Sequence, residues 1–375
     1  QYYNDGAIIH SWHGFILNYK EDFSNHPEYL AEIDGKRLGY GKSNKLCVTN
    51  KNVQNLFIEF TRKRIQDNPQ FKYISIEPSD GLNFCDCINC RKLDGISNQV
   101  FYFANQVAKE IKKSHPDKQL GLYAYNTHTD PPNFKIEDNV KVVVASKGFQ
   151  TSHSPMGIMQ SWVEVETYQK LGLYEYFGIP QWTGDLPIIV VQDYINRIRY
   201  AQKNNFDMMI FESSVNINAA ILMTLMSQIL MNPSLKWEDV YDKFLEDCFN
   251  DSKIPIQRLF DRWHSSPKYI ISDINYVVYD LNEATKLAKD PKEIQRIRDL
   301  KAYLHYQILY LEWSADRNNI NTLKKYFDYV YNSSNRNIVN LSALSQVFAK
   351  NLSVDKSLQS KYTYLLNQKV LEFYE

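Results

Sequence analysis

The sequence lacks an excess of either charge, because lysine and arginine total 43 and aspartate and glutamate also total 43. A balanced chain offers no basic surface for nucleic acid, and no acidic tail is present. No segment comes near the roughly 18 consecutive apolar residues that a membrane helix requires. Neither a glycine-rich phosphate loop nor a GxSxG sequence occurs, which argues against a nucleotide site and against a serine hydrolase.

Aromatic residues are abundant, with 27 Tyr, 19 Phe and 6 Trp in 375 residues. Aromatic rings fill protein cores, and they also stack on the apolar faces of sugar rings whose hydroxyl groups need polar partners. The composition leaves both interpretations open. The functional one is a carbohydrate partner.

Strands and helices alternate through the first two thirds of the chain. Helices are expected near 51–67, 97–114, 158–171, 188–204 and 218–230, and six strands are expected to begin near residues 7, 73, 120, 140, 173 and 207. Alternation of this kind predicts a parallel sheet with crossover helices, here a TIM-type (β/α)8 barrel over residues 1–235. A closed barrel needs about eight strands, so we expect the first strands to lie upstream of Gln1.

The pattern changes at Lys236, after the break that Pro233 marks. From there helical spacing replaces strand alternation, which predicts an all-α C-terminal domain over residues 236–375. We expect this domain to pack against the barrel and to carry no chemistry. Its helices are expected near 255–264, 268–288, 292–315, 319–332, 338–350 and 356–373.

Chemistry in an α/β barrel gathers where the strands end. Cleavage of a glycosidic bond uses one protonated and one ionised carboxyl group, whose environments must hold their pKa values apart. We assign Asp80 as the acid, with Glu175 as its partner and Glu212 as the second choice. No cofactor is needed for this reaction. Substrate contacts are predicted for His10, Trp12, His13, Glu77, Tyr125, His128 and Trp182.

Three cysteines follow the strand near residue 73 in the spacing Cys85-x-Cys87-x-x-Cys90. Thiolates this close can bind a structural Zn²⁺, with Cys47 or a histidine as the fourth ligand. A disulfide with one spare thiol is the competing interpretation. In either case the cysteines would fix the loop that carries Asp80.

The order of several motifs resembles the DUF4838 family over roughly residues 7–250. The motifs are His10-Ser11-Trp12, His26-Pro27-Glu28-Tyr29, Asp34-Gly35-Lys36-Arg37, Leu46-Cys47-Val48-Thr49-Asn50, Ser79-Asp80-Gly81 and the three-cysteine spacing. That family occurs largely in polysaccharide-degrading bacteria such as Bacteroidetes and is related in fold to α-glucuronidases and β-hexosaminidases. The resemblance implies carbohydrate metabolism by an exported, periplasmic or cell-surface protein.

The related hexosaminidase-type barrels keep their acid at the end of the fourth strand, so the resemblance carries that role onto Asp80. Those enzymes have an Asp-Glu pair where this chain has Ser79-Asp80-Gly81, which is a departure from their pattern. We therefore expect a glycoside hydrolase acting on a polysaccharide or glycan. The alternative is a carbohydrate-binding protein that holds a glycan at the same strand ends without cutting it. A barrel that only supports other domains is a third interpretation.

Overall fold

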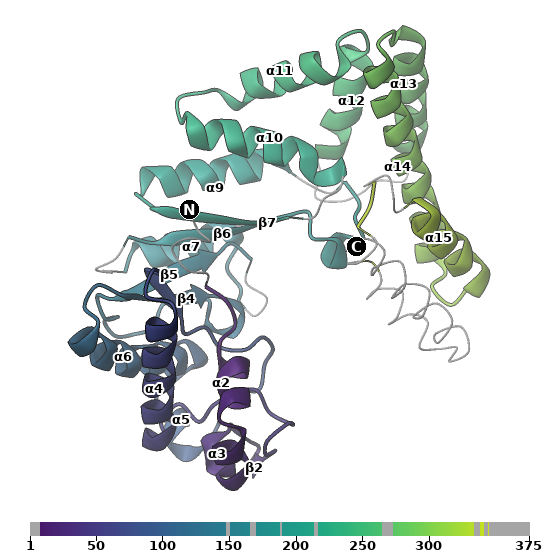
Figure 1. The fold of residues 1–375 in the computed structure, drawn as a ribbon. Coiled ribbons are helices and arrows are strands. Elements are labelled where there is room, and N and C mark those ends of the chain that lie inside the picture. The colour runs from purple at the N-terminus through teal and green to yellow at the C-terminus, as the bar shows by residue number, and fades with distance from the viewer. Residues whose placement is uncertain are drawn as a thin grey trace. The chain divides into compact units, whose positions relative to one another are not determined.

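The computed structural model describes residues 8–147, 151–165, 170–187, 190–213, 217–264, 273–333, 338–340 and 344. The fold is mixed α/β, and the chain divides into two compact units (Figure 1). The first unit runs up to Glu175 and includes Arg199–Phe211, and the second contains Tyr176–Ile198 and the chain from Glu212 onward. The units do not follow the expected division at residue 235, which stays a prediction.

A five-stranded sheet organises the α/β part. Its strands lie side by side in chain order: β3 (Tyr73–Ser75), β4 (Gln119–Ala124), β5 (Val140–Ala145), β6 (Gly172–Phe177) and β7 (Met208–Ser213). The pairs from β3 through β6 are parallel, with Ser75 beside Gly121 and Val144 beside Leu173. Five of the six expected strands and the parallel arrangement are therefore confirmed. Closure into an eight-stranded barrel stays a prediction.

The sixth expected strand, over residues 7–13, is wrong for the residues described: only His10 forms a β-bridge, and no strand is present there. Within the described chain, His10 forms one parallel bridge with Glu77, and the Ser11 amide donates to the Glu77 carbonyl at 2.9 Å. A helix then begins at Trp12. The stripe formed by Trp12, Phe15 and Ile16 has helical spacing and buries one face of α2 (Trp12–Asn18), which overrides strand propensity.

Glycine at position 121 lets the N-terminal segment lie against β4. A Cβ atom there would collide with the side chain of Ile8. The Tyr123 hydroxyl donates to the Ile8 carbonyl at 2.6 Å, which ties the same two segments together. The segment that carries His10 therefore packs on β4 through Ile8 and pairs with the chain after β3 through Glu77.

Two long helices cover the sheet beside β3 and β4, namely α4 (Lys51–Asp67) and α6 (Ile96–Ser114) (Figure 1). The Asn50 side chain caps α4 by accepting from the amides of Asn52 and Val53, as its sequence predicts. Phe57 on α4 and Phe103 on α6 meet edge to face, with ring centroids 5.1 Å apart. Each fully buried ring contributes roughly 1.5–3 kcal/mol to stability.

Shorter elements connect these. The loop region before α4 contains α3 (Lys20–Asn25), η1 (Pro27–Tyr29) and the antiparallel pair β1 (Glu32–Ile33) and β2 (Lys36–Arg37). Between the strands lie α5 (Ile88–Arg91), η2 (Asn126–His128), α7 (Pro155–Val163), α8 (Pro180–Thr183) and α9 (Val191–Lys203).

The described elements from residue 217 to residue 333 are helices: α10 (Ile217–Met231), α11 (Trp237–Phe249), α12 (Lys253–His264), α13 (Ile274–Leu287), α14 (Pro291–Ala315) and α15 (Ile320–Ser333). These confirm the helices expected from residue 236 to about residue 332. The two expected over 338–350 and 356–373 fall almost wholly outside the described residues, so a wholly helical domain stays a prediction. Among the helices described, none combines the length and the apolar character needed to cross a membrane.

The second unit has a buried tyrosine cluster around a tight turn. Gly184 and Asp185 both have positive φ angles, of 62° and 57°. The Tyr303 hydroxyl donates to the Asp185 carbonyl at 2.6 Å, and the Tyr306 hydroxyl donates to the Gly184 carbonyl. Burial raises the pKa of Asp185 to about 7, although the Asn340 amide donates to its carboxylate.

Candidate functional site

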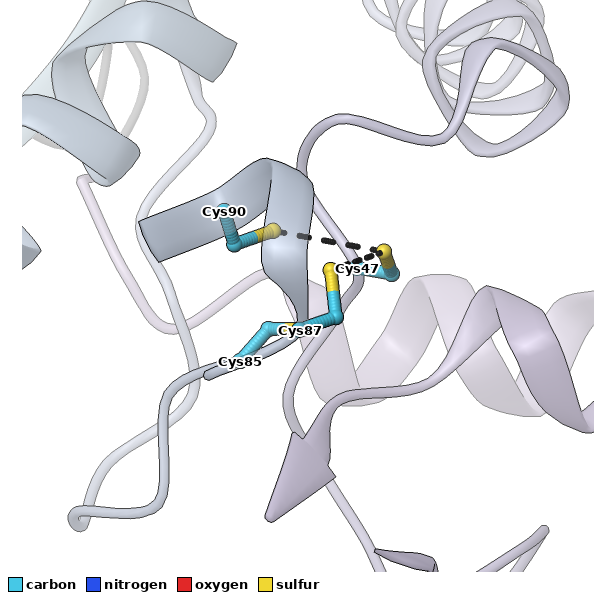
Figure 2. Close-up of side chains that lie close together, drawn as sticks. All are labelled: Cys47, Cys85, Cys87 and Cys90. Carbon is cyan, nitrogen blue, oxygen red and sulfur yellow. Dashed lines mark hydrogen bonds between the residues drawn. The ribbon is translucent and has the colours of Figure 1, made fainter. Parts of the chain in front are cut away.

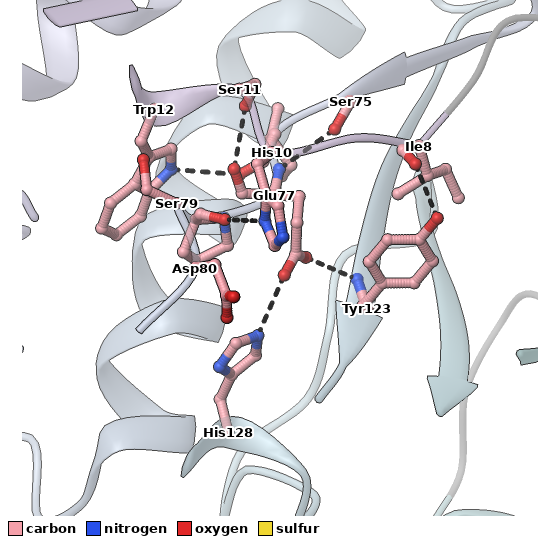
Figure 3. Close-up of polar contacts among 12 residues, drawn as sticks. Ile8, His10, Ser11, Trp12, Ser75, Glu77, Ser79, Asp80, Tyr123 and His128 are labelled. Atoms are coloured by element: carbon pink, nitrogen blue, oxygen red, sulfur yellow. Dashed lines mark hydrogen bonds and ion pairs between the residues drawn. The ribbon is translucent and has the colours of Figure 1, made fainter. Parts of the chain in front are cut away.

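The most deeply buried carboxylate near the strand ends belongs to Glu77, which follows β3 and is fully buried. Its Oε2 accepts from the Tyr123 amide at 2.7 Å (Figure 3). Its Oε1 lies 3.4 Å from Nε2 of His128, a residue of the η2 turn that follows β4. The end of β3 and the end of β4 therefore bring an acidic and an imidazole side chain face to face.

The turn that carries His128 is fixed by backbone contacts. The His128 amide donates to the Tyr125 carbonyl at 3.0 Å, and the Trp162 indole donates to the Thr129 carbonyl at 2.7 Å. Asn126 has a positive φ of 54°, which is uncommon for a residue other than glycine. This strained, anchored turn holds the imidazole in one place, an arrangement common at binding sites.

Several buried side-chain atoms of this region make no hydrogen bond within the part of the chain that the structure describes. They are Glu77 Oε1, Ser79 Oγ, Asn126 Oδ1, Thr127 Oγ1, Thr129 Oγ1 and both ring nitrogens of His128. Most buried polar atoms in folded proteins have a partner, and each exception needs a physical reason. Such atoms are concentrated at two neighbouring strand ends, in the same region as the exposed His10 and Asp80.

His10 and Tyr125 lie next to this pair. The exposed His10 ring must donate from Nδ1, because it lies 2.6 Å from the Pro78 carbonyl oxygen, which can only accept. The ring centroid of Tyr125 is 6.5 Å from that of His10 and 6.4 Å from that of His128. Four of the residues predicted to contact substrate, His10, Glu77, Tyr125 and His128, are thus neighbours.

Asp80 is exposed in the loop that follows Glu77. Its carboxylate accepts from the Gly81 amide at 2.8 Å, and its carbonyl accepts from the side chains of Asn44 at 3.2 Å and Lys45 at 3.4 Å. The side chain is open to solvent. A ligand at the ends of β3 and β4 could therefore meet it.

Lys45 was missed from the sequence. The side chain is buried, with 1% exposed, and its ammonium group donates to the Ser79 carbonyl and lies 4.4 Å from the ring centroid of Phe84. Burial lowers the pKa of Lys45 to about 8, against the opposing effect of the negative charges of Glu77 and Asp80. No local signal in the sequence identifies it, because its partners Ser79 and Asp80 lie more than 30 residues away in the chain.

Trp12 does not belong to an open site, and its predicted role in substrate binding is wrong. The indole is fully buried, packs edge to face on Phe103 and donates from Nε1 to the Ile76 carbonyl at 3.1 Å. No face of the ring is left for a sugar. His13 is exposed on α2.

Glu175 is also buried, with 2% exposed, and its Oε1 accepts from the Ser146 hydroxyl at 2.5 Å. Side chains alternate along a strand, and Glu175 shares the buried side of β6 with Leu173 and Phe177. Tyr174 is half-buried on the other side, where its ring contacts that of Tyr123 at 5.1 Å. The carboxylate of Glu175 therefore points away from the tyrosines, which argues against pairing it with Asp80.

Trp182 and Glu212 belong to the second unit. The Trp182 ring is 39% exposed on α8 and meets the Tyr176 ring edge to face at 4.8 Å. Glu212 is exposed in β7. Their predicted roles stay predictions.

A second constellation joins two segments of the first unit: the four buried cysteines Cys47, Cys85, Cys87 and Cys90, called here the four-cysteine cluster (Figure 2). Their sulfur atoms all lie within 4.8 Å of one another, with Cys47 Sγ 3.8 Å from Cys87 Sγ and 4.0 Å from Cys90 Sγ. All four thiols are free, so the alternative of a disulfide is not what the structure contains. Such a cluster can bind a metal ion.

Donor groups surround these sulfur atoms. The Glu32 amide donates to Cys85 Sγ at 3.3 Å, and the Thr49 hydroxyl lies 3.3 Å from Cys90 Sγ. Contact with the neighbouring thiols, Cys85 first and then Cys90, holds the pKa of Cys47 well below that of an ordinary thiol. The negative charge of Cys47 and Cys85 in turn raises the pKa of the Arg37 guanidinium, against its partial burial. The surroundings therefore favour the thiolate, the form that binds metal, at Cys47. Contact with Cys47 raises the pKa of Cys85 to about 12 and also raises that of Cys90 well above the ordinary value.

Comparison with known proteins identifies one family. The family model described as "Domain of unknown function (DUF4838)" matches residues 1–261. No curated protein and no solved structure matches the chain.

Proposed function

The chain belongs to the DUF4838 family, whose function is unknown, and we propose from its own site that it is a glycoside hydrolase acting on a polysaccharide or glycan. One observation carries the proposal. Among the residues that the structure describes, buried polar atoms that make no hydrogen bond gather at Glu77, Ser79 and the turn from Asn126 to Thr129, beside half-buried tyrosines.

A carbohydrate suits this surface because it carries many hydroxyl groups, each both a donor and an acceptor. The atoms without a hydrogen bond include acceptors such as Glu77 Oε1, which faces His128, and hydroxyl groups such as that of Ser79, which can donate or accept. Tyr123 in β4 and Tyr125 directly after it offer ring faces for the apolar side of a sugar. A ligand with polar and apolar faces therefore fits better than a uniformly charged or uniformly apolar one.

Hydrolysis is favoured over simple binding by two carboxylates in different environments at one strand end. Glu77 is buried against the Tyr123 amide and His128, whereas Asp80 is exposed. Glycosidic cleavage uses one carboxyl group as acid and a second one as base or nucleophile. In the proposed reaction Asp80 gives its proton to the leaving glycosidic oxygen as the bond from the anomeric carbon breaks. Water then adds to that carbon and gives a proton to the Asp80 carboxylate, which restores the acid.

A panel of oligosaccharides incubated with the protein, and read for both products and binding, tests the proposal. We expect Asp80→Asn to abolish product formation while binding and folding are retained. Asp67→Asn, a change at an exposed carboxylate at the end of α4, is the matched control and should behave like the wild type. Equal turnover by Asp80→Asn and the wild type would refute the assignment.

Binding without cleavage is the second candidate, and the placement of Glu175 favours it. The Glu175 carboxylate, which was expected to assist Asp80, accepts a hydrogen bond from Ser146 on the buried side of β6. A protein that only binds glycans would give no products with any sugar of the panel. Tyr125→Ala would still weaken binding.

We further infer that the four-cysteine cluster binds a structural Zn²⁺. Four thiolates around zinc at about 2.3 Å stand about 3.8 Å apart at the corners of a tetrahedron. The separations of Cys47 Sγ from Cys87 Sγ and Cys90 Sγ, 3.8 and 4.0 Å, agree with this spacing. Elemental analysis of protein purified without added metal should give one zinc per chain. A Cys90→Ser variant should contain less, and a Cys248→Ser variant should contain the same amount.

A further inference from the structure

We propose that Lys45 is a positioning residue through which the four-cysteine cluster controls the order of the Asp80 loop, defined as residues 79–84. A metal ion in the four-cysteine cluster would then affect the candidate site without contacting a molecule bound there. The significance of this coupling for catalysis rests on the function proposed for Asp80. The coupling itself rests on contacts within the first unit and on the zinc site proposed for the four-cysteine cluster.

Lys45 holds one end of the Asp80 loop. Its ammonium group donates to the carbonyl groups of Ser79 and Asp80, and the Asn44 side chain also donates to the Asp80 carbonyl. The ammonium group also lies 4.4 Å from the ring centroid of Phe84, at the other end of the same loop. One buried cation therefore touches both ends of a six-residue segment.

The backbone around Lys45 is fixed by the same region that presents Cys47. The Ala31 amide donates to the Lys45 carbonyl at 2.9 Å, and the Cys47 amide donates to the Tyr29 carbonyl at 2.9 Å. Leu46, between them, forms an antiparallel bridge with Leu30. A shift of Cys47 thus carries Lys45 with it.

The other three cysteines begin directly after the loop. Phe84 is followed by Cys85, and the Glu32 amide donates to the sulfur of that cysteine. A metal ion bound by all four thiolates would lock Cys47 to this second segment. The loop from Ser79 to Phe84 would then be clamped at its start by Lys45 and at its end by the metal site.

Direct contact of Lys45 with a ligand fits the structure less well. With 1% of the residue exposed, the ammonium group is shielded from solvent, and it is directed at two backbone carbonyls and a ring face. A lysine that recognises substrate would present its cation to solvent or to the open site. The geometry assigns Lys45 to the loop.

Hydrogen exchange measured by mass spectrometry on the full chain tests the coupling without any sugar. In the wild type with Zn²⁺ bound, amides of the Asp80 loop should exchange at least tenfold more slowly than after chelation. Adding Zn²⁺ back should restore protection. Lys45→Met should lose loop protection while it keeps its zinc, and Lys45→Arg should keep part of the protection because it retains a donor cation. Lys42→Met, at an exposed lysine three residues away, should match the wild type.

Two results would overturn the inference: unchanged loop protection in Lys45→Met that is folded by circular dichroism, or unchanged loop protection after the metal is removed. Should Lys45→Met fail to fold, the chelated wild type and Lys45→Arg still decide the matter. If a glycan substrate is found, Lys45→Met should lower kcat by about tenfold to a hundredfold, since small displacements of catalytic groups are costly. KM should change less. If no glycan is cleaved or bound, the proposed function fails, while the exchange result stands or falls by itself.

Discussion

Glu77 and His128 face each other at the ends of β3 and η2, with Glu77 Oε1 3.4 Å from His128 Nε2 and both residues buried. Neither of these two atoms has a hydrogen bond to the protein in the part of the chain that the structure describes. The pair therefore combines mutual proximity with unused bonding capacity. That combination suits a binding site better than a purely structural contact.

A double-mutant cycle on this pair should show coupling. We expect Glu77→Gln and His128→Gln to interact by about 0.5–3 kcal/mol in the free energy of unfolding, because the two groups are in contact. Urea denaturation of the wild type, the single variants and the double variant measures this. Glu77→Gln combined with His13→Gln, at an exposed histidine on α2, should be additive. Additive effects in both cycles would show that Glu77 and His128 do not interact.

Trp12 should matter for stability and not for ligand recognition. Trp12→Ala removes a fully buried ring and should lower the free energy of unfolding by about 3–5 kcal/mol. Trp182→Ala, which truncates a ring that is 39% exposed, should cost less. Chemical denaturation ranks the two. A smaller loss for Trp12→Ala would contradict the packing described for α2.

Removal of metal should destabilise the first unit. A structural zinc ion contributes its binding free energy to folding, so chelation should lower the denaturation midpoint, and added Zn²⁺ should restore it. Cys90→Ser should have a low midpoint that zinc no longer raises. Cys248→Ser is the control, because Cys248 lies on α11 away from the four-cysteine cluster in sequence and is only half-buried. A midpoint indifferent to chelator would exclude a stabilising metal.

The buried Asp185 predicts a pH dependence of stability. Its pKa is about 7 in the folded chain and near 3.8 when unperturbed. Between these values the folded chain keeps a proton that the unfolded chain has lost. The free energy of unfolding should therefore fall as pH rises from about 4 to about 7, by on the order of 1 kcal/mol per pH unit from this group.

Asp185→Asn isolates that contribution, because an asparagine oxygen can still accept from the Asn340 amide. The difference in unfolding free energy between wild type and variant should change across this window and level off above about pH 7. Thermal or urea unfolding at a series of pH values measures it. A constant difference would mean that Asp185 does not hold a proton in the folded chain.

Local signals in the sequence predicted much of the fold. The helix expected near 51–67 is α4, and five of the expected strands appear in chain order. The Ala7–His13 segment failed because its strand-forming residues overlap the helical stripe of Trp12, Phe15 and Ile16. Where a short segment satisfies two periodicities, packing decides between them.

The candidate site was predicted less completely, because the position of some of its residues depends on partners that are distant in the sequence. Glu77, Tyr125 and His128 could be placed near one another because they follow strands that were predicted and are present. Lys45 could not, since lysines are rarely buried without a partner and its partners lie more than 30 residues away in the chain. The alternation Tyr174-Glu175-Tyr176 did contain a signal, since it places the carboxylate and the tyrosines on opposite sides of β6.

The four-cysteine cluster also bears on how the chain reaches its fold. Cys47 is separated from the other three cysteines by a segment that includes all of α4 and β3. A metal ion bound to Cys47 and to the other three cysteines closes a loop of about forty residues. Closing such a loop before folding carries an entropic cost of several kcal/mol. Capture of the ion is therefore cheapest once α4 has packed and β3 has found its place. The metal ion would then bind late, when the domain is almost folded, and would not initiate its folding.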